Sequence, residues 1–164
     1  ADNINIDDAS CDKITATQTL EYIEDIDTSL KEIKRISKTN SKFVNVSILW
    51  DYFRFYGPEK KINDLIHEAF RAHCFHQMLP LDLNGKLKKL GYKNISSQNL
   101  SYLITNRDNN SPAIFYETML SKFALSQGVS EDKVDDWKKQ LNKSEKVGNF
   151  GFTSFPVLTA AYLG

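Results

Sequence analysis

A helical pattern between two strand-like runs is the sequence feature that most constrains the fold. Apolar residues recur at steps of three and four between positions 20 and 36, which is typical of an amphipathic helix starting near Asp25 or Asp27. Residues 11–17 and 43–49, on either side, have the length and the β-branched content of strands. Because strand, helix and strand in this order form the building unit of parallel sheets, the chain is predicted to be an α/β protein.

The remainder of the chain continues this alternation. The expected elements are, in order, a helix over residues 62–77, a helix over 83–90, a strand over 92–103, helices over 112–127 and 130–143, and a strand-like run over 149–163. Pro80 is expected to end the first of these helices and Gly91 the second. Pro156 interrupts the final run, which predicts a bend or an edge position there.

Composition excludes several classes of protein. The chain has 21 Lys and Arg against 21 Asp and Glu, so no net charge draws it to nucleic acid or to an anionic membrane. Two cysteines are too few for a disulfide framework, and no apolar run approaches the ~18 residues of a membrane span. Residues 1–10 are acidic and polar, unlike a signal peptide. We therefore expect a soluble, cytoplasmic protein.

Two kinds of catalytic centre are also not supported. His67, His73, Cys74 and His76 lie on one expected helix, but no carboxylate or second cysteine completes a zinc site, so no metal is predicted. No Gly-x-Ser-x-Gly elbow is present for a nucleophilic triad.

Five segments, in order, resemble the small-molecule branch of class I S-adenosylmethionine (SAM)-dependent methyltransferases, which is similar to the ubiquinone-biosynthesis enzymes. The segments are residues 1–14, 15–25, 30–36, 87–95 and 149–155. The second resembles the family's fourth strand and the loop after it, and the last resembles its seventh strand. Residues 38–41 depart from the family, which has a Lys-Pro-Gly-Gly turn there.

The resemblance implies a particular half-sheet. The family's strand order is 3-2-1-4-5-7-6 with strand 7 antiparallel, and this chain would supply strands 4, 5, 7 and 6, with helices on both faces. Residues 1–164 would be a single domain, the C-terminal part of a methyltransferase domain, with helical inserts at 58–80 and 112–143 capping the substrate pocket. The strand at 13–17 would then be an open edge, so we expect a protein partner or a missing N-terminal half to cover it.

SAM is the cofactor that the resemblance implies, in a site that this chain holds only in part. The glycine-rich turn and the acidic residues that contact the ribose and adenine have no counterpart in the sequence. By resemblance, Thr17 and Gln18 would face the methionine end of SAM with Tyr22 nearby, and Asp2 and Asn3 would border the adenine. The alternative is that Thr17 and Gln18 cap the following helix and that Tyr22 belongs to the core.

Substrate contacts are expected beyond the next strand. Trp50 and Arg54 stand where the family places them, and Asp51 is the candidate general base; its alternative is a solvated turn carboxylate. His73 and His76, in the first insert, would line the pocket, or else take part in ordinary helix packing.

Two functions follow from this pattern. The first is SAM-dependent methyl transfer to a small-molecule acceptor, with this chain supplying the strand-4 wall and the substrate cap. The second is a degenerate, non-catalytic methyltransferase-like subunit with a structural or interaction role. Retention of Thr17-Gln18 and Trp50-Asp51 favours the first, whereas the missing cofactor motifs favour the second.

Overall fold

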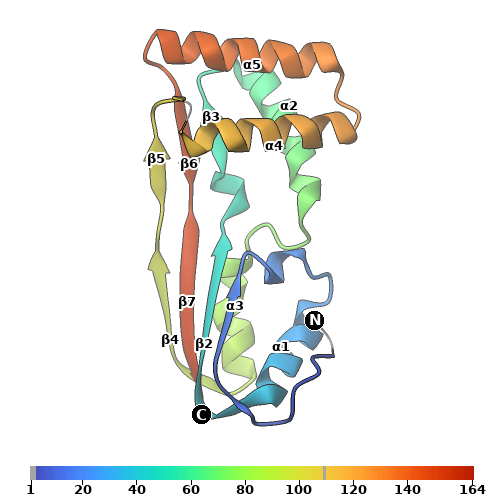
Figure 1. The fold of residues 1–164 in the computed structure, drawn as a ribbon, viewed down its shortest axis with the longest axis vertical. Coiled ribbons are helices and arrows are strands. Elements are labelled where there is room, and N and C mark those ends of the chain that lie inside the picture. Colours follow the sequence, from blue (N-terminus) through green and yellow to red (C-terminus); the bar gives the residue numbers. More distant parts are fainter. Residues whose placement is uncertain (1–2, 109) are drawn as a thin grey trace. The chain divides into compact units, whose positions relative to one another are not determined.

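The computed structural model describes residues 3–108 and 110–164, whose contacts divide into two compact units. The first unit comprises Ala1–Asp51, Cys74–Ser101 and Phe155–Gly164. The second comprises Tyr52–His73 and Tyr102–Ser154. The chain therefore passes between the units several times, as the colours in Figure 1 show.

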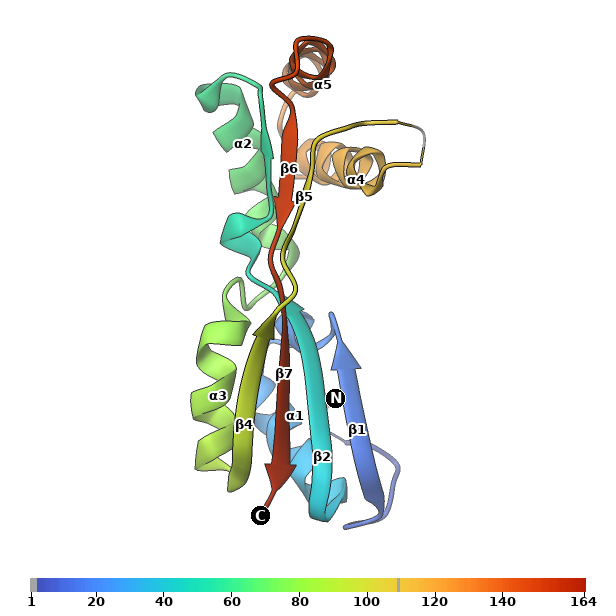
Figure 2. The same ribbon diagram turned by 90° about the vertical axis from the view of Figure 1, so that its left-hand side faces the viewer.

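The first unit is built on a four-stranded sheet (Figure 2). Its strands are β1 (Cys11–Thr17), β2 (Ser37–Ile48), β4 (Tyr92–Asn99) and β7 (Pro156–Leu163), in the order β1-β2-β7-β4. β1 is parallel to β2, whereas β7 is antiparallel to both β2 and β4. This confirms the predicted half-sheet, in which β1, β2, β7 and β4 take the places of the family's strands 4, 5, 7 and 6.

The helix that joins β1 to β2 begins where its sequence predicts. In α1 (Ile26–Ile36), the Asp25 carboxylate accepts a hydrogen bond from the Thr28 N–H at 3.0 Å, which caps the helix. Residues 38–41, where the family has a turn, belong to β2, which starts directly after α1. These residues instead form an irregularity in β2: Cys11 pairs with Ser37, but Lys13 already pairs with Lys42. Asn40, with φ of 64°, takes the left-handed conformation that asparagine tolerates.

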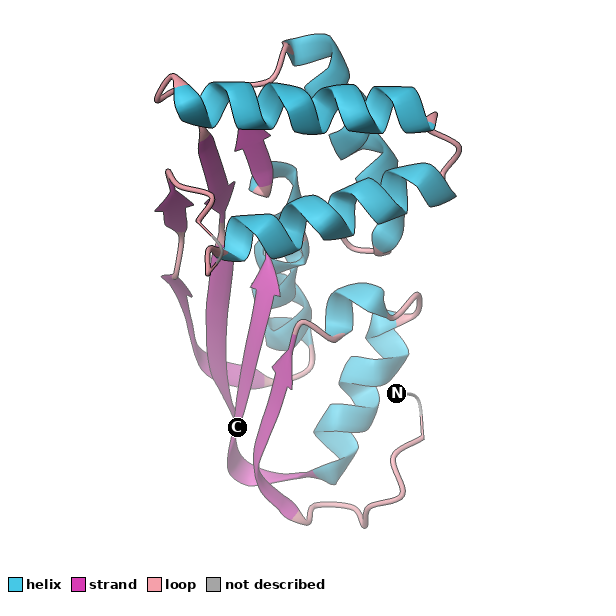
Figure 3. Ribbon diagram, turned by 45° about the horizontal axis from the view of Figure 1, so that its top comes forward, coloured by secondary structure: helices cyan, strands magenta, loops and turns pink. Residues whose placement is uncertain are grey.

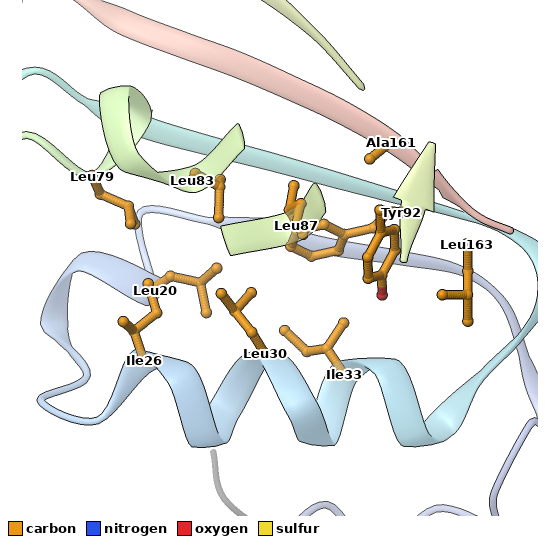
Figure 4. Close-up of a cluster of buried hydrophobic side chains, with 11 residues drawn as sticks. Leu20, Ile26, Leu30, Ile33, Leu79, Leu83, Leu87, Tyr92, Ala161 and Leu163 are labelled. Atoms are coloured by element: carbon orange, nitrogen blue, oxygen red, sulfur yellow. The ribbon is translucent and has the colours of Figure 1, made fainter. Parts of the chain in front are cut away.

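One hydrophobic core fills the space between the sheet and two helices of this unit. α1 and α3 (Leu79–Lys89) pack on the same face of the sheet (Figure 4). The core consists of Leu20, Ile26, Leu30, Ile33, Phe43, Leu79, Leu83, Leu87, Tyr92, Ala161 and Leu163. On the opposite face of the sheet, Val44, Val46, Leu158 and Ala160 remain half-buried.

The second unit combines three short strands with three helices (Figure 3). β3 (Arg54–Tyr56), β6 (Gly151–Ser154) and β5 (Tyr102–Ile104) form an antiparallel sheet in the order β3-β6-β5. The helices are α2 (Lys60–Phe70), α4 (Pro112–Ser126) and α5 (Glu131–Lys146), which confirms the two helices expected after residue 112. Phe155 divides the final run into β6 and β7; Pro156 is the first residue of β7, which lies inside its sheet and not at the edge considered for it.

Three expectations for residues 62–103 are wrong. The strand expected over 92–103 is divided into β4 and β5, and the two pieces join different sheets. The helix expected to run to Gln77 ends with α2 at Phe70, followed by a 3-10 turn, η3 (Arg71–His73). Pro80 does not end a helix; it lies in the first turn of α3, where the missing N–H costs nothing.

Aromatic side chains form the core of the second unit. Phe55 packs edge-on against Trp137, with 5.4 Å between the ring centroids. The Trp137 Nε1–H donates to the Asn63 Oδ1 at 2.9 Å, and the Asn63 amide donates to the Phe55 carbonyl at 2.8 Å. The Phe55 N–H donates to the His67 Nε2 at 3.2 Å. Burial lowers the pKa of His67 to about 3, so its ring stays neutral and can accept this bond.

We predict that the core around α3 can be tested with two leucines of this helix. Leu83 is 0% exposed and Leu81 is 68% exposed. Leu83→Ala should lower the free energy of unfolding by about 2–5 kcal/mol because it leaves a cavity. Leu81→Ala should change it by less than about 0.5 kcal/mol. Urea denaturation of both variants measures the difference, and equal losses would contradict this packing.

Candidate functional site

The candidate site lies where the parallel strands β1 and β2 end, which is where α/β sheets bind ligands. Thr17, the last residue of β1, is exposed, and its carbonyl accepts a hydrogen bond from the Thr19 hydroxyl at 2.9 Å. The exposed Gln18 has φ of 46°, and its N–H donates to the Val46 carbonyl at 2.8 Å. Both residues are therefore at the rim of the sheet, in a loop whose backbone is anchored to β2.

Tyr22 closes the short 3-10 turn η1 (Leu20–Tyr22) that follows. Its side chain is 40% exposed and lies outside the core. Burial of the hydroxyl, together with the charges of Glu21 and Cys74, raises the pKa of Tyr22 to about 12. Its phenol thus stays protonated at neutral pH.

Trp50 and Asp51 come one residue beyond the end of β2, in the 3-10 turn η2 (Trp50–Tyr52). The Trp50 side chain is buried, with 8% of the residue exposed. The backbone N–H of Trp50 donates to the Gln77 carbonyl at 2.9 Å. Asp51 is exposed. The candidate base therefore stands at the same edge of the sheet as Thr17.

His76 reaches the loop after β1. Its Nε2 lies 2.9 Å from the Ile23 carbonyl oxygen and 3.2 Å from that of Glu24. The ring thus fastens the segment before α3 to the loop that carries Tyr22. The structure brings together six expected site residues of the first unit: Thr17, Gln18, Tyr22, Trp50, Asp51 and His76.

The other expected residues have different surroundings. Arg54 and His73 belong to the second unit, where Arg54 pairs with the Asp64 carboxylate. The His73 ring stacks on Phe70 at 4.0 Å between centroids. Asn3 is exposed, next to Ile4, whose N–H is bound by Glu32 of α1 at 2.8 Å. Asp2 lies outside the described residues.

Comparison with known proteins gives a family match and several similar structures. A family model described as "Methyltransferase domain" matches residues 1–45. A putative methyltransferase (BH2331) from Bacillus halodurans has a TM-score of 0.55 at 11% identity, over 98% of this chain and 73% of its own. The YcgJ protein from Bacillus subtilis has a TM-score of 0.57 at 13% identity, over 99% of this chain and 68% of its own.

A third similar structure is the phosphoethanolamine N-methyltransferase 2 of Haemonchus contortus, solved in complex with S-adenosyl-L-methionine. Its TM-score is 0.51 at 16% identity, over 97% of this chain and 34% of its own. No curated protein matches the chain. The chain has the class I methyltransferase fold.

The candidate site also contains a buried acid, Glu21, that was not predicted from the sequence. Glu21 is 0% exposed. Its Oε2 accepts a hydrogen bond from the Ser47 hydroxyl at 3.0 Å, and the Asn45 amide donates to that hydroxyl at 2.8 Å. Burial raises the pKa of Glu21, an effect partly offset by bonds from its own backbone, Ser47, Ile48 and Thr19. The available sequence signal was the pair Asn45 and Ser47, two polar residues on the inward side of an apolar strand.

Two further observations concern possible metal sites and membrane spans in the part of the chain that the structure describes. Across residues 3–108 and 110–164, no three His, Cys, Asp or Glu side chains gather into a group that could hold a metal ion. None of the described helices combines the length and the apolar character needed to cross a membrane.

We predict a pH signature for Glu21. Because its folded-state pKa lies above the ordinary value of 4.5, the native state binds more protons than the unfolded state as the pH rises through that value. The contribution of Glu21 to stability is therefore fully present below pH 4.5 and is lost as the pH rises through the folded-state pKa. In Glu21→Gln this loss should disappear.

Chemical denaturation from acid to neutral pH measures the difference in unfolding free energy between wild type and Glu21→Gln. Other carboxylates titrate equally in both proteins and cancel. As the pH rises, the unfolding free energy of the wild type should fall relative to that of Glu21→Gln. A difference independent of pH would show that Glu21 does not titrate abnormally.

Proposed function

We propose that this chain takes part in SAM-dependent methyl transfer to a small-molecule acceptor. The observation that carries the proposal is the β1-β2-β7-β4 sheet with antiparallel β7, joined to a methyltransferase-domain match over residues 1–45. That match includes β1 and the loop with Thr17 and Gln18. The similar Haemonchus contortus enzyme holds S-adenosyl-L-methionine, which supports the same cofactor here.

The cofactor side of the proposed site is the end of β1. Thr17 and Gln18 would face the methionine part of SAM, with Tyr22 beside them, and Asp2 and Asn3 would border the adenine. Exposure of Thr17 and Gln18 at the strand end supports this role, because a ligand can reach them there.

The acceptor side of the proposed site is the end of β2. Methyl transfer requires an acceptor aligned with the sulfonium, so positioning groups and one base are sufficient. Asp51 is the proposed base, because its carboxylate is exposed directly after the strand. Trp50 and His76 would shape the pocket through their fixed positions. Arg54, in the segment after β2, and His73, in the insert at 58–80, would also contact substrate.

Completion of the site requires residues that this chain does not contain. The sequence has no glycine-rich turn or ribose carboxylate of the family type. Within residues 3–108 and 110–164, β1 is an edge strand that pairs with β2 alone, and Lys13 is the only basic residue of β1. We propose that a protein partner or an N-terminal half of the domain covers this edge. No disulfide joins Cys11 and Cys74, which suits the cytoplasm that we propose for the protein.

The alternative is a non-catalytic, methyltransferase-like subunit with a structural or interaction role. The same missing cofactor residues favour it. The two functions differ in whether the completed protein binds SAM.

We predict that residues 1–164 alone give no heat of binding in calorimetric titration with SAM. The same chain, joined to or mixed with a segment that carries the glycine-rich turn, should bind SAM at micromolar concentration. Micromolar binding by residues 1–164 alone would contradict the proposed division of the site. A folded, complete protein without SAM affinity would favour the non-catalytic alternative.

A pair of matched substitutions tests the position of the cofactor in the complete protein. Thr15 and Thr17 are both exposed residues of β1, two positions apart. Thr17→Lys should weaken SAM binding about tenfold, because its charge lies near the sulfonium. Thr15→Lys should leave the affinity within about threefold of wild type, because it lies about 7 Å further along the strand. Equal effects of the two substitutions would place the cofactor elsewhere.

A further inference from the structure

The Glu21 side chain is fully buried at the carboxyl ends of β1 and β2. Carboxylates are almost never fully buried unless they are paired or hydrogen-bonded, because desolvation penalises the charged form. No ion pair accounts for Glu21 among the described residues, and its Oε1 has no hydrogen-bond partner there. A leucine or methionine would fill the same space without this cost, so the acid must do something that an apolar side chain cannot.

The carboxyl group of Glu21 fastens the loop after β1 to the end of β2. Oε2 accepts the Ser47 hydroxyl at 3.0 Å, which ties the carboxyl group to a residue next to the end of β2. Asn45 supports Ser47 from one step earlier along the inward face of β2. The loop and the strand end are thereby held by a side chain rather than by sheet pairing.

The backbone of Glu21 fastens the same loop to a third segment. Its carbonyl accepts from the N–H groups of Phe75 at 3.0 Å and His76 at 3.1 Å. The adjacent Gln77 carbonyl accepts the Trp50 N–H at 2.9 Å. Glu21 therefore links the loop with Thr17 and Gln18, the end of β2, and the segment that supports Trp50.

We propose that Glu21 is a positioning residue that fixes the loop from Thr17 to Tyr22 in the conformation needed for cofactor contact. The expected effect of Glu21 on SAM binding rests on the proposed function. Its expected effect on the conformation of the loop does not. Glu21 itself touches no cofactor, since it has no exposed surface. It acts through Gln18, whose left-handed backbone is sterically strained and must be held by its surroundings.

Hydrogen exchange of residues 1–164 tests the loop directly. In Glu21→Ala, amides of residues 18–23 and 75–77 should exchange at least about tenfold faster than in wild type, because a buried hydrogen-bond network is lost. Glu21→Gln, which keeps an acceptor for Ser47, should restore slow exchange. Leu83→Ala, a buried substitution on α3, controls for general loss of stability and should not produce the local change.

SAM affinity of the complete protein is the second readout. Glu21→Ala should raise the Kd for SAM about tenfold, whereas Glu21→Gln and Leu83→Ala should remain within about threefold of wild type. Unchanged loop exchange in Glu21→Ala, or an equal change in Leu83→Ala, overturns the inference. Faster loop exchange in a protein whose wild type binds no SAM supports the positioning role and overturns the proposed function instead.

Discussion

The pairing of the final strand with two earlier strands is the interaction on which the first unit depends. β7 lies between β2 and β4, and its hydrogen bonds join strands that are more than forty residues apart along the chain. Its inward residues Ala161 and Leu163 belong to the same core as α1 and α3. Without β7, β4 and α3 would have no sheet to pack on, and the ends of β1 and β2 would lose the scaffold that fixes the candidate site.

Local signals predicted the elements that local interactions determine. The apolar period and the Asp25 cap were sufficient for α1, and Pro112 with Gly128 were sufficient for α4. The order of strands came from the resemblance, because the insertion of β7 is a long-range pairing that periodicity cannot indicate. The split of the 92–103 run into β4 and β5 was missed for the same reason, since its two halves pair with different partners.

The site divides in a similar way. Thr17 and Gln18 stand at the end of β1, and Trp50 and Asp51 come shortly after β2, so the strand positions were enough to place them at one edge. His76 and Glu21 join that edge through contacts between segments more than twenty residues apart, such as Glu21 with Ser47, which the sequence alone does not reveal. The alternative of a structural role is strongest for His76, whose ring holds backbone carbonyls, and for His73, whose ring stacks within the second unit.

We infer that the chain forms the C-terminal part of a methyltransferase sheet, and we propose that β1 is one wall of a shared SAM site. A crystal structure of the complete protein with S-adenosylhomocysteine tests this most directly. We expect another strand paired along the free edge of β1, and the ligand against the loop from Thr17 to Tyr22. A ligand bound away from that loop, or a β1 edge that stays open in the complete protein, would contradict it.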